Sequence, residues 1–184
     1  AEEATEMGLQ LGDTMTVNVL GRDITAEIPT VTIPDDHDVY QGNVWGEGGR
    51  AAPGRDNTGG YVHAARFVNV VHRTQTSHLP DPYDPAPIEQ GITAYYTDMV
   101  YGRVSFAVVA DRMFKSGCAG HGLPPSGTGR PDHYNNTEFD TADLDLPGLK
   151  LLGDRQLSFL NHWAGDWEGA DMKVAMSQTI FANM

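Results

Sequence analysis

The chain has 184 residues, enough for one domain with a hydrophobic core. Its 12 Lys and Arg against 25 Asp and Glu give a formal net charge of −13, and this negative excess opposes binding to nucleic-acid phosphates and to anionic lipid heads. The hydrophobic share of 40% is too large for a disordered acidic chain, so we expect a globular protein that does not bind nucleic acid non-specifically.

The first third of the chain predicts short strands and a loop. Residues 14–28 alternate β-branched and polar side chains around a Leu-Gly-Arg-Asp turn, a pattern typical of a β-hairpin. Residues 30–33, TVTI, form a further β-run that ends at Pro34, directly before an acidic cluster. Residues 41–60 hold seven glycines and few apolar residues, which indicates a long loop.

The middle of the chain predicts a helix and a second hairpin. Apolar residues recur at helical spacing over residues 60–73, which predicts one amphipathic helix. Residues 92–112 carry β-forming side chains on both sides of Gly102 and Arg103. This pattern favours a hairpin whose second strand is fully buried and ends at Asp111.

The last part of the chain predicts an irregular excursion, a helix and a strand. Residues 115–149 are rich in Gly, Pro, Asp and Asn and show no sustained period. Four apolar residues then recur every three or four positions: Leu157, Leu160, Ala164 and Trp167. They predict a helix at about 153–167 with this stripe facing the core and with Asp154 and Asp166 in solvent. A β-run over 173–181 completes an alternation that favours an α/β layered fold.

Cysteine content and apolar runs exclude further classes of protein. The single cysteine, Cys118, excludes an internal disulfide framework and a four-thiolate zinc site. The longest apolar run, residues 104–110, is far shorter than the roughly 20 residues of a membrane-spanning helix. The opening residues, AEEATEMG, have neither a basic start nor an apolar stretch, so no signal peptide is visible. We therefore expect no membrane span.

An acidic cluster follows the TVTI run. Asp35, Asp36 and Asp38 surround His37. Three carboxylates and one imidazole are a ligand set that suits Mn, Fe, Zn or Ca, and the imidazole could alternatively act as a general acid. A solvated acidic turn explains the same pattern. The residues alone leave these interpretations open.

Other candidate patterns are weaker. Cys118 and His121 form a C-x-x-H pair that could begin a zinc site, but no second pair completes it, so an incidental role is favoured. The glycines of GEGGR at 46–50 could approach an anionic ligand with Arg50 as a clamp, although a flexible linker is favoured. The chain contains no G-x-S-x-G elbow, no G-x-x-x-x-G-K-[ST] loop and no G-x-G-x-x-G after a strand.

The string PDDHDVYQGNVWGEGGR at 34–50 resembles the central part of the PhoD-like metallophosphatases, the alkaline phosphatase D group of the calcineurin-like phosphoesterase superfamily. The resemblance covers about residues 29–184 and keeps the family's order. Its further segments are RTQTSHLPDPYDP (73–85), YYTDMVYGRVSFAVVADRMFKSG (95–117), GRPDH (129–133), LLGDRQLSFLNHWAGDW (151–167) and ADMKVAMSQTIFAN (170–183).

This resemblance implies a fold, an activity and a location. The fold is an α/β structure, a partial and incomplete four-layer α/β/β/α metallophosphoesterase sandwich, to which the sequence adds an N-terminal β-hairpin. The activity is metal-dependent hydrolysis of phosphoric esters, both monoesters and diesters. The family also suggests an extracytoplasmic location. In such enzymes two metals hold the phosphate and activate a water, while an imidazole assists the leaving oxygen.

Residue by residue, the resemblance implies that Asp36 ligates a metal and that His37 is the catalytic imidazole. It assigns support of the turn, orientation or phosphate contact to four further residues: Asp35, Asp38, Asp111 and Arg112. The implied cofactors are divalent or trivalent metal ions, and the ligand set does not distinguish Fe, Ca, Mn and Zn. The implied partner is a phosphoric-ester substrate.

Several ligand motifs of the superfamily are missing from this sequence. They are an Asp-x-His or Asp-x-Trp on the first strand, an Asp after the second strand, and later G-x-H or G-x-H-x-H motifs. Residues 8–28 instead resemble a β-rich extracytoplasmic segment of lipoprotein-export-type ABC permeases. We therefore expect a β-hairpin segment over 1–28 and a partial phosphatase domain over 29–184, with little turnover by this chain alone. The alternative is a non-catalytic fragment or acidic binding module that holds at most one Ca²⁺ weakly.

Overall fold

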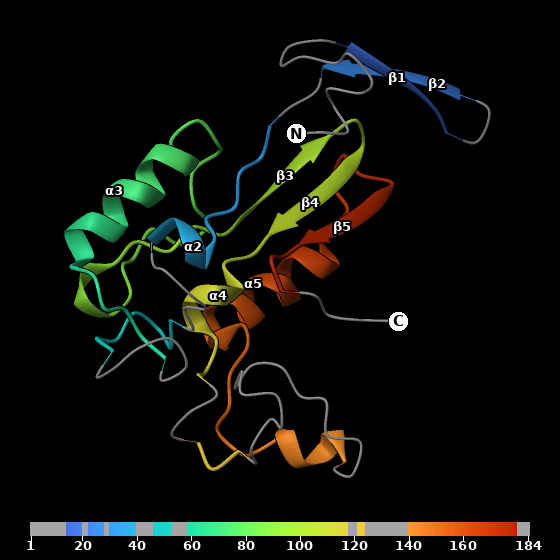
Figure 1. The fold of residues 1–184 in the computed structure, drawn as a ribbon. Coiled ribbons are helices and arrows are strands. Elements are labelled where there is room, and N and C mark those ends of the chain that lie inside the picture. Colours follow the sequence, from blue (N-terminus) through green and yellow to red (C-terminus); the bar gives the residue numbers. More distant parts are fainter. Residues whose placement is uncertain are drawn as a thin grey trace.

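The computed structural model combines helices with two small β-sheets (Figure 1). It describes residues 14–19, 22–27, 30–39, 46–52, 59–117, 121–123 and 140–179. In chain order the elements are β1 (Thr14–Val19), β2 (Arg22–Glu27), α2 (Asp36–Val39), α3 (Ala65–Thr76), η1 (Glu89–Gly91), β3 (Thr97–Tyr101), β4 (Val104–Val108), α4 (Asp111–Phe114), η2 (Thr141–Leu144), α5 (Gly153–Gly165) and β5 (Met172–Met176). These elements confirm a mixed α/β class, and the four-layer sandwich stays a prediction.

The central sheet has three strands in the order β3-β4-β5. β3 and β4 pair antiparallel across Gly102 and Arg103, which both have positive φ angles of 56° and 66°. Two positive φ angles match the right-handed twist of a tight hairpin, so the hairpin predicted at this position is confirmed. Its second strand, however, ends at Val108 rather than at Asp111 and is only partly buried, because Val104 and Phe106 keep some exposure. β5 pairs parallel with β4, with Val104 opposite Met172. Parallel strands need a crossover, and the chain between β4 and β5 includes α5.

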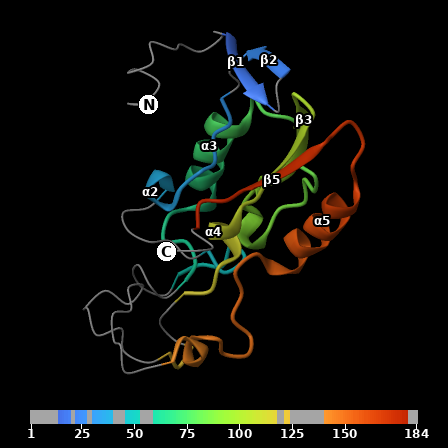
Figure 2. The same cartoon turned by 90° about the vertical axis from the view of Figure 1, so that its right-hand side faces the viewer.

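Helix α5 packs against one face of this sheet and supplies part of the core. Its Phe159 is fully buried, with its ring centroid 5.5 Å from that of Tyr96. Trp163 Nε1 donates a hydrogen bond to Ser105 Oγ at 2.8 Å, which fixes the helix over β4. Figure 2 shows α5 alongside β5. This helix face therefore covers part of one side of the sheet.

The helix was predicted in the right place but with the wrong face inward. Leu157 is 49% exposed and Trp167 is 54% exposed, whereas Leu160 is partly buried against the core. The buried positions are instead Gln156 and Phe159. Gln156 Oε1 accepts a hydrogen bond from Ala110 N at 2.7 Å, and its Nε2 donates to Leu152 O at 2.7 Å. Because its amide is satisfied, this polar residue occupies a core position that hydrophobic periodicity does not detect.

The other face of the sheet is apolar and carries a cavity. Side chains alternate across a strand, so Met99 and Phe106 point away from the face that α5 covers. Together with Met176, Tyr101 and Val31 they line a cavity of about 370 Å³. The segment through Val31 therefore runs over this face on its way to α2.

Two predictions for the first half of the chain are wrong. Residues 30–33 form no strand. The helix predicted over 60–73 spans Ala65–Thr76 instead. Tyr61 lies in a β-bridge with Ala51, because Tyr61 N donates to Arg50 O at 2.8 Å and Ala52 N donates to Tyr61 O at 2.9 Å. These backbone bonds hold residue 61 outside the helix.

The remaining outcomes concern the ends of the chain. β1 and β2 pair antiparallel, but residues 20–21 lie outside the described residues, so the hairpin turn and the separate 1–28 segment stay predictions. β5 ends at Met176, five residues earlier than the predicted strand. Within the described part of the chain, no helix has the length and apolar character needed to cross a membrane.

Candidate functional site

The acidic cluster forms one helical turn, α2, at the carboxyl-terminal edge of the parallel pair β4 and β5. Asp35 N donates to Asp38 Oδ2 at 2.7 Å, and Asp38 N donates to Asp35 O at 3.1 Å, so the turn caps itself. Asp36 and Val39 are buried on its inner side. In both cartoon views α2 lies beside α3 (Figure 1, Figure 2). Ligand sites of open α/β sheets occupy the same kind of edge.

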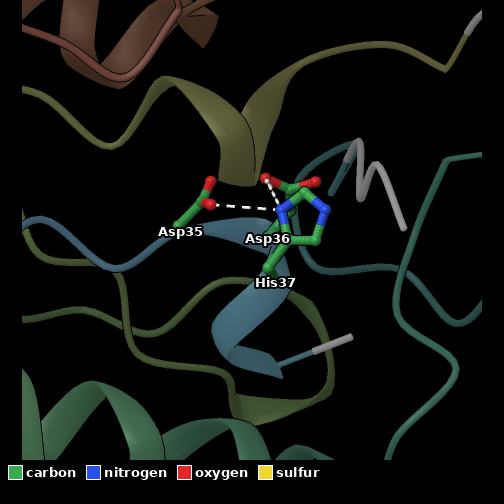
Figure 3. A group of neighbouring side chains, drawn as sticks. All are labelled: Asp35, Asp36 and His37. Carbon is green, nitrogen blue, oxygen red and sulfur yellow. Dashed lines mark hydrogen bonds and ion pairs between the residues drawn. The ribbon is translucent and has the colours of Figure 1, made fainter. Parts of the chain in front are cut away.

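Three side chains of this turn converge. His37 Nδ1 is 3.2 Å from Asp35 Oδ2 and 3.5 Å from Asp36 Oδ1. Figure 3 shows the imidazole between the two carboxylates, with the same ring nitrogen toward both. One ligand atom from each of the three residues lies within 4.8 Å of the others, a spacing that fits coordination of one metal ion. The His37 side chain is 65% exposed, so its other ring nitrogen is accessible to solvent.

The two carboxylates of this cluster have opposite pKa shifts. The Asp36 side chain is fully buried, and this burial, with a hydrogen bond to Asp35, raises its pKa to about 6 against the charge of Arg112. Burial alone would raise the pKa of Asp35. Its hydrogen bonds with Asp36 and His37 outweigh this effect and hold the pKa below its ordinary value. As the pH rises, Asp36 therefore keeps its proton longer than Asp35 does.

The structure brings Arg112 to the cluster and keeps Asp111 apart from it. Arg112 Nη1 donates to Asp36 Oδ1 at 3.0 Å. Asp111 is fully buried, and its Oδ1 accepts from Gln178 N at 3.4 Å. Asp111 is not a member of the group whose ligand atoms lie within 4.8 Å of one another. Asp38, the fourth acidic residue of the motif, is exposed and acts on the turn through Asp35 N.

The donor set fits one hard metal ion. Two carboxylates and an imidazole suit Mn²⁺, Fe or Zn²⁺, and the carboxylates alone suit Ca²⁺. All three side chains come from a single turn. Among the described residues, no second group of three or more His, Cys, Asp or Glu side chains meets the same spacing. The described part of the chain therefore offers a place for one ion.

A second polar cluster surrounds Glu47 and was not predicted. Glu47 Oε1 accepts from Gly117 N and from His121 Nε2, both at 2.7 Å, and Glu47 Oε2 lies 2.7 Å from Arg50 Nη1. A Cβ at Gly59 would lie 2.6 Å from the Glu47 carboxylate, so only glycine fits there. Arg50, a candidate anion clamp, is thus paired within the chain. Cys118, the partner proposed for His121, lies outside the described residues.

Comparisons with models of known protein families, with curated proteins and with solved structures found no match to this chain. The function proposed below therefore depends on the local geometry and on the sequence resemblance.

Proposed function

We propose that this chain carries part of the active site of a metal-dependent phosphoric-ester hydrolase of the PhoD-like kind. The observation that carries the proposal is the convergence of Asp35, Asp36 and His37 beside Arg112 at the carboxyl edge of the parallel strands. Phosphoryl transfer uses components of this kind: a carboxylate that binds a cation, an imidazole exposed to solvent and a guanidinium group.

Each residue has a distinct role in this proposal. Asp36 holds the metal ion, and Arg112 keeps its carboxylate in place through the 3.0 Å contact. When bound, the ion supplies neutralisation of the phosphate charge and activation of a water. His37 donates a proton to the leaving oxygen from its exposed ring nitrogen. Asp35 orients the imidazole by its contact with Nδ1.

A second candidate function is a non-catalytic acidic module that binds one Ca²⁺ weakly. The observation that favours it is the origin of all three side chains in consecutive residues, Asp35 and the first two residues of α2. Three neighbouring residues cannot surround an ion that takes six to eight oxygen ligands. In this alternative the two carboxylates supply only part of a loose coordination shell, and His37 is not a ligand. The two candidates therefore assign different roles to His37.

The experiment measures turnover and metal binding in the same samples. Hydrolysis of p-nitrophenyl phosphate and of bis-p-nitrophenyl phosphate is followed with Mn²⁺, Fe³⁺, Zn²⁺ or Ca²⁺ supplied, and Mn²⁺ affinity is measured by calorimetry. We expect kcat far below the 10 s⁻¹ that is roughly typical of enzymes. His37→Ala should lower kcat by about 10²–10⁴ and leave Mn²⁺ affinity within about threefold of wild type. Asp36→Asn should weaken Mn²⁺ binding by about tenfold or more.

The matched control is Asp154→Asn, which removes an exposed carboxylate from α5. It should change neither turnover nor Mn²⁺ affinity. Equal turnover in wild type and His37→Ala would contradict the hydrolase. Loss of Ca²⁺ binding in Asp36→Asn but not in His37→Ala, with no turnover in any variant, would favour the binding module.

A further inference from the structure

Gln178 links three parts of the chain at the edge of the sheet. It follows the end of β5 by two residues, and β5 runs parallel to β4, so it lies level with the residues that follow β4. Its backbone N donates to Asp111 Oδ1 at 3.4 Å. Its side-chain Nε2 donates to Ile33 O at 3.1 Å and also to Pro34 O. A glutamine amide has two N–H donors, and both are used on consecutive carbonyl groups.

The two carbonyl groups belong to the segment that leads directly into the acidic turn. Further along, Arg112 contacts Asp36, and earlier in the segment Thr32 Oγ1 donates to Gln75 O. The segment from Thr32 to Asp36 is therefore attached at three points. Thr32 bonds to α3, the next two residues bond to Gln178 just after β5, and Asp36 bonds to α4. Gln178 supplies the middle attachment, immediately before Asp35.

The edge of the sheet around Gln178 contains several buried polar atoms. Among the described residues, Asp111 Oδ2, Ser177 Oγ and Thr179 Oγ1 are buried and make no hydrogen bond. Buried polar atoms without partners lower stability, and native proteins keep few of them away from functional sites. Two of the three flank Gln178 in sequence, and the third belongs to the residue that its backbone contacts.

We propose that Gln178 is a positioning residue for the candidate site: its amide fixes Ile33 and Pro34 on the end of β5 and so sets the placement of Asp36 and His37. This inference rests on the proposed function, because it assigns the attachment a purpose in metal binding and turnover. The Gln178 amide donates to backbone carbonyl groups of residues 33–34, so it acts on the cluster through the backbone of this segment.

The test replaces the amide without changing the size of the side chain. Gln178→Met removes both donors, and Gln178→Glu keeps the shape but places oxygen atoms against the two carbonyl groups. The control is Gln90→Met, which removes a comparable bond, from Gln90 Nε2 to Gly49 O at 2.7 Å, away from the acidic turn. Hydrogen exchange is followed at the amides of Asp35 and Asp38, because their N–H groups form the bonds that close the turn.

We expect exchange at these two amides to accelerate by about tenfold in Gln178→Met and in Gln178→Glu, as the loss of two hydrogen bonds implies. Mn²⁺ affinity should fall by a similar factor, and kcat should fall while KM stays nearly constant. Gln90→Met should leave the exchange, the affinity and kcat unchanged. A global loss of stability would accelerate exchange in α5 as well, so protection of α5 amides separates positioning from unfolding.

Exchange at Asp35 and Asp38 that stays within about twofold of wild type in both Gln178 variants would overturn the inference. If Gln178→Met fails to fold, Gln178→Glu alone decides the question. Absence of Mn²⁺ binding and turnover in the wild type would contradict the proposed function, and with it the purpose of the attachment. The exchange data would still decide whether Gln178 holds the turn.

Discussion

Two acidic residues, Asp36 and Glu47, are stabilised in contrasting ways: Asp36 contacts α4 itself, and Glu47 contacts the residues that follow it. Glu47 accepts from Gly117 N and His121 Nε2 and pairs with Arg50, all at 2.7 Å, and these contacts attach its loop to the segment after α4. Asp36 is more deeply buried and contacts Arg112, but it also lies against a second carboxylate. Its pKa is raised to about 6 as a consequence.

Glu47 is therefore a carboxylate that stabilises the fold, whereas Asp36 is a carboxylate that can bind a cation. Donors from three residues offset the loss of hydration around Glu47, so its charge holds the loop together. The charge of Asp36 is disfavoured by its surroundings, and an added cation would relieve that cost. Raised pKa values of this kind are concentrated at functional sites. The comparison leads to three predictions beyond the experiments above.

The largest expected effect is on stability. Glu47→Ala should lower the free energy of unfolding by about 2–4 kcal/mol, because it leaves Gly117 N, His121 and Arg50 without their shared acceptor. Asp36→Asn should cost much less at pH 7, since it removes a disfavoured charge. Urea denaturation followed by circular dichroism measures both values. A larger loss in Asp36→Asn than in Glu47→Ala would invert the comparison.

The second effect is stabilisation by metal. Mn²⁺ at about 100 times its dissociation constant should raise the free energy of unfolding by about 2.7 kcal/mol in wild type. Glu47→Gln should keep this gain, whereas Asp36→Asn should lose most of it. The gain should also shrink as the pH falls below about 6, because Asp36 must lose its proton to bind the ion. Thermal unfolding with and without Mn²⁺ provides the test, and a gain that survives Asp36→Asn would refute the site.

The third effect is a pH dependence in the absence of metal. The Asp36 pKa is about 6 in the folded protein and 3.8 in its unperturbed form, so folding favours the protonated carboxyl group. Its contribution to stability is full below pH 3.8 and is lost as the pH rises to about 6. The slope from this group is at most about 1.4 kcal/mol per pH unit. Urea denaturation from pH 4 to 7 measures the free energy of unfolding of wild type and of Asp36→Asn. The difference between the two should fall over this range, and a constant difference would contradict the raised pKa.

The sequence predicted the elements whose signals are local. The hairpin around Gly102 and Arg103 is confirmed because the tight turn and its β-forming flanks lie within one short stretch. Helix α5 was located correctly because its apolar spacing persists over three turns. The acidic turn was recognised as a candidate site because its carboxylates and imidazole are neighbours in sequence. The family resemblance assigned Arg112 an orienting or phosphate-contact role, but nothing in the sequence predicted its contact with Asp36.

Three of the failures involve contacts between residues that are separated in the sequence. No local pattern shows that Tyr61 pairs with Ala51 rather than beginning α3, or that Gln156 fills a core position through bonds to Ala110. Gln178 was missed because its hydrogen-bond partners precede it by more than 140 residues. The one available signal was a polar side chain at the end of a strand, and the predicted strand extended past it.

The parallel pairing of β4 with β5 also dictates the order in which the molecule can be assembled. Residues 109–171 separate the two strands, so pairing β4 with β5 closes a long loop. The entropy cost of closing this loop makes the pairing slower than formation of the β3–β4 hairpin. The acidic turn precedes both strands, yet one of its attachments, Gln178, comes after β5. The complete site therefore requires β5 to be in place, although its ligands precede both strands in the sequence.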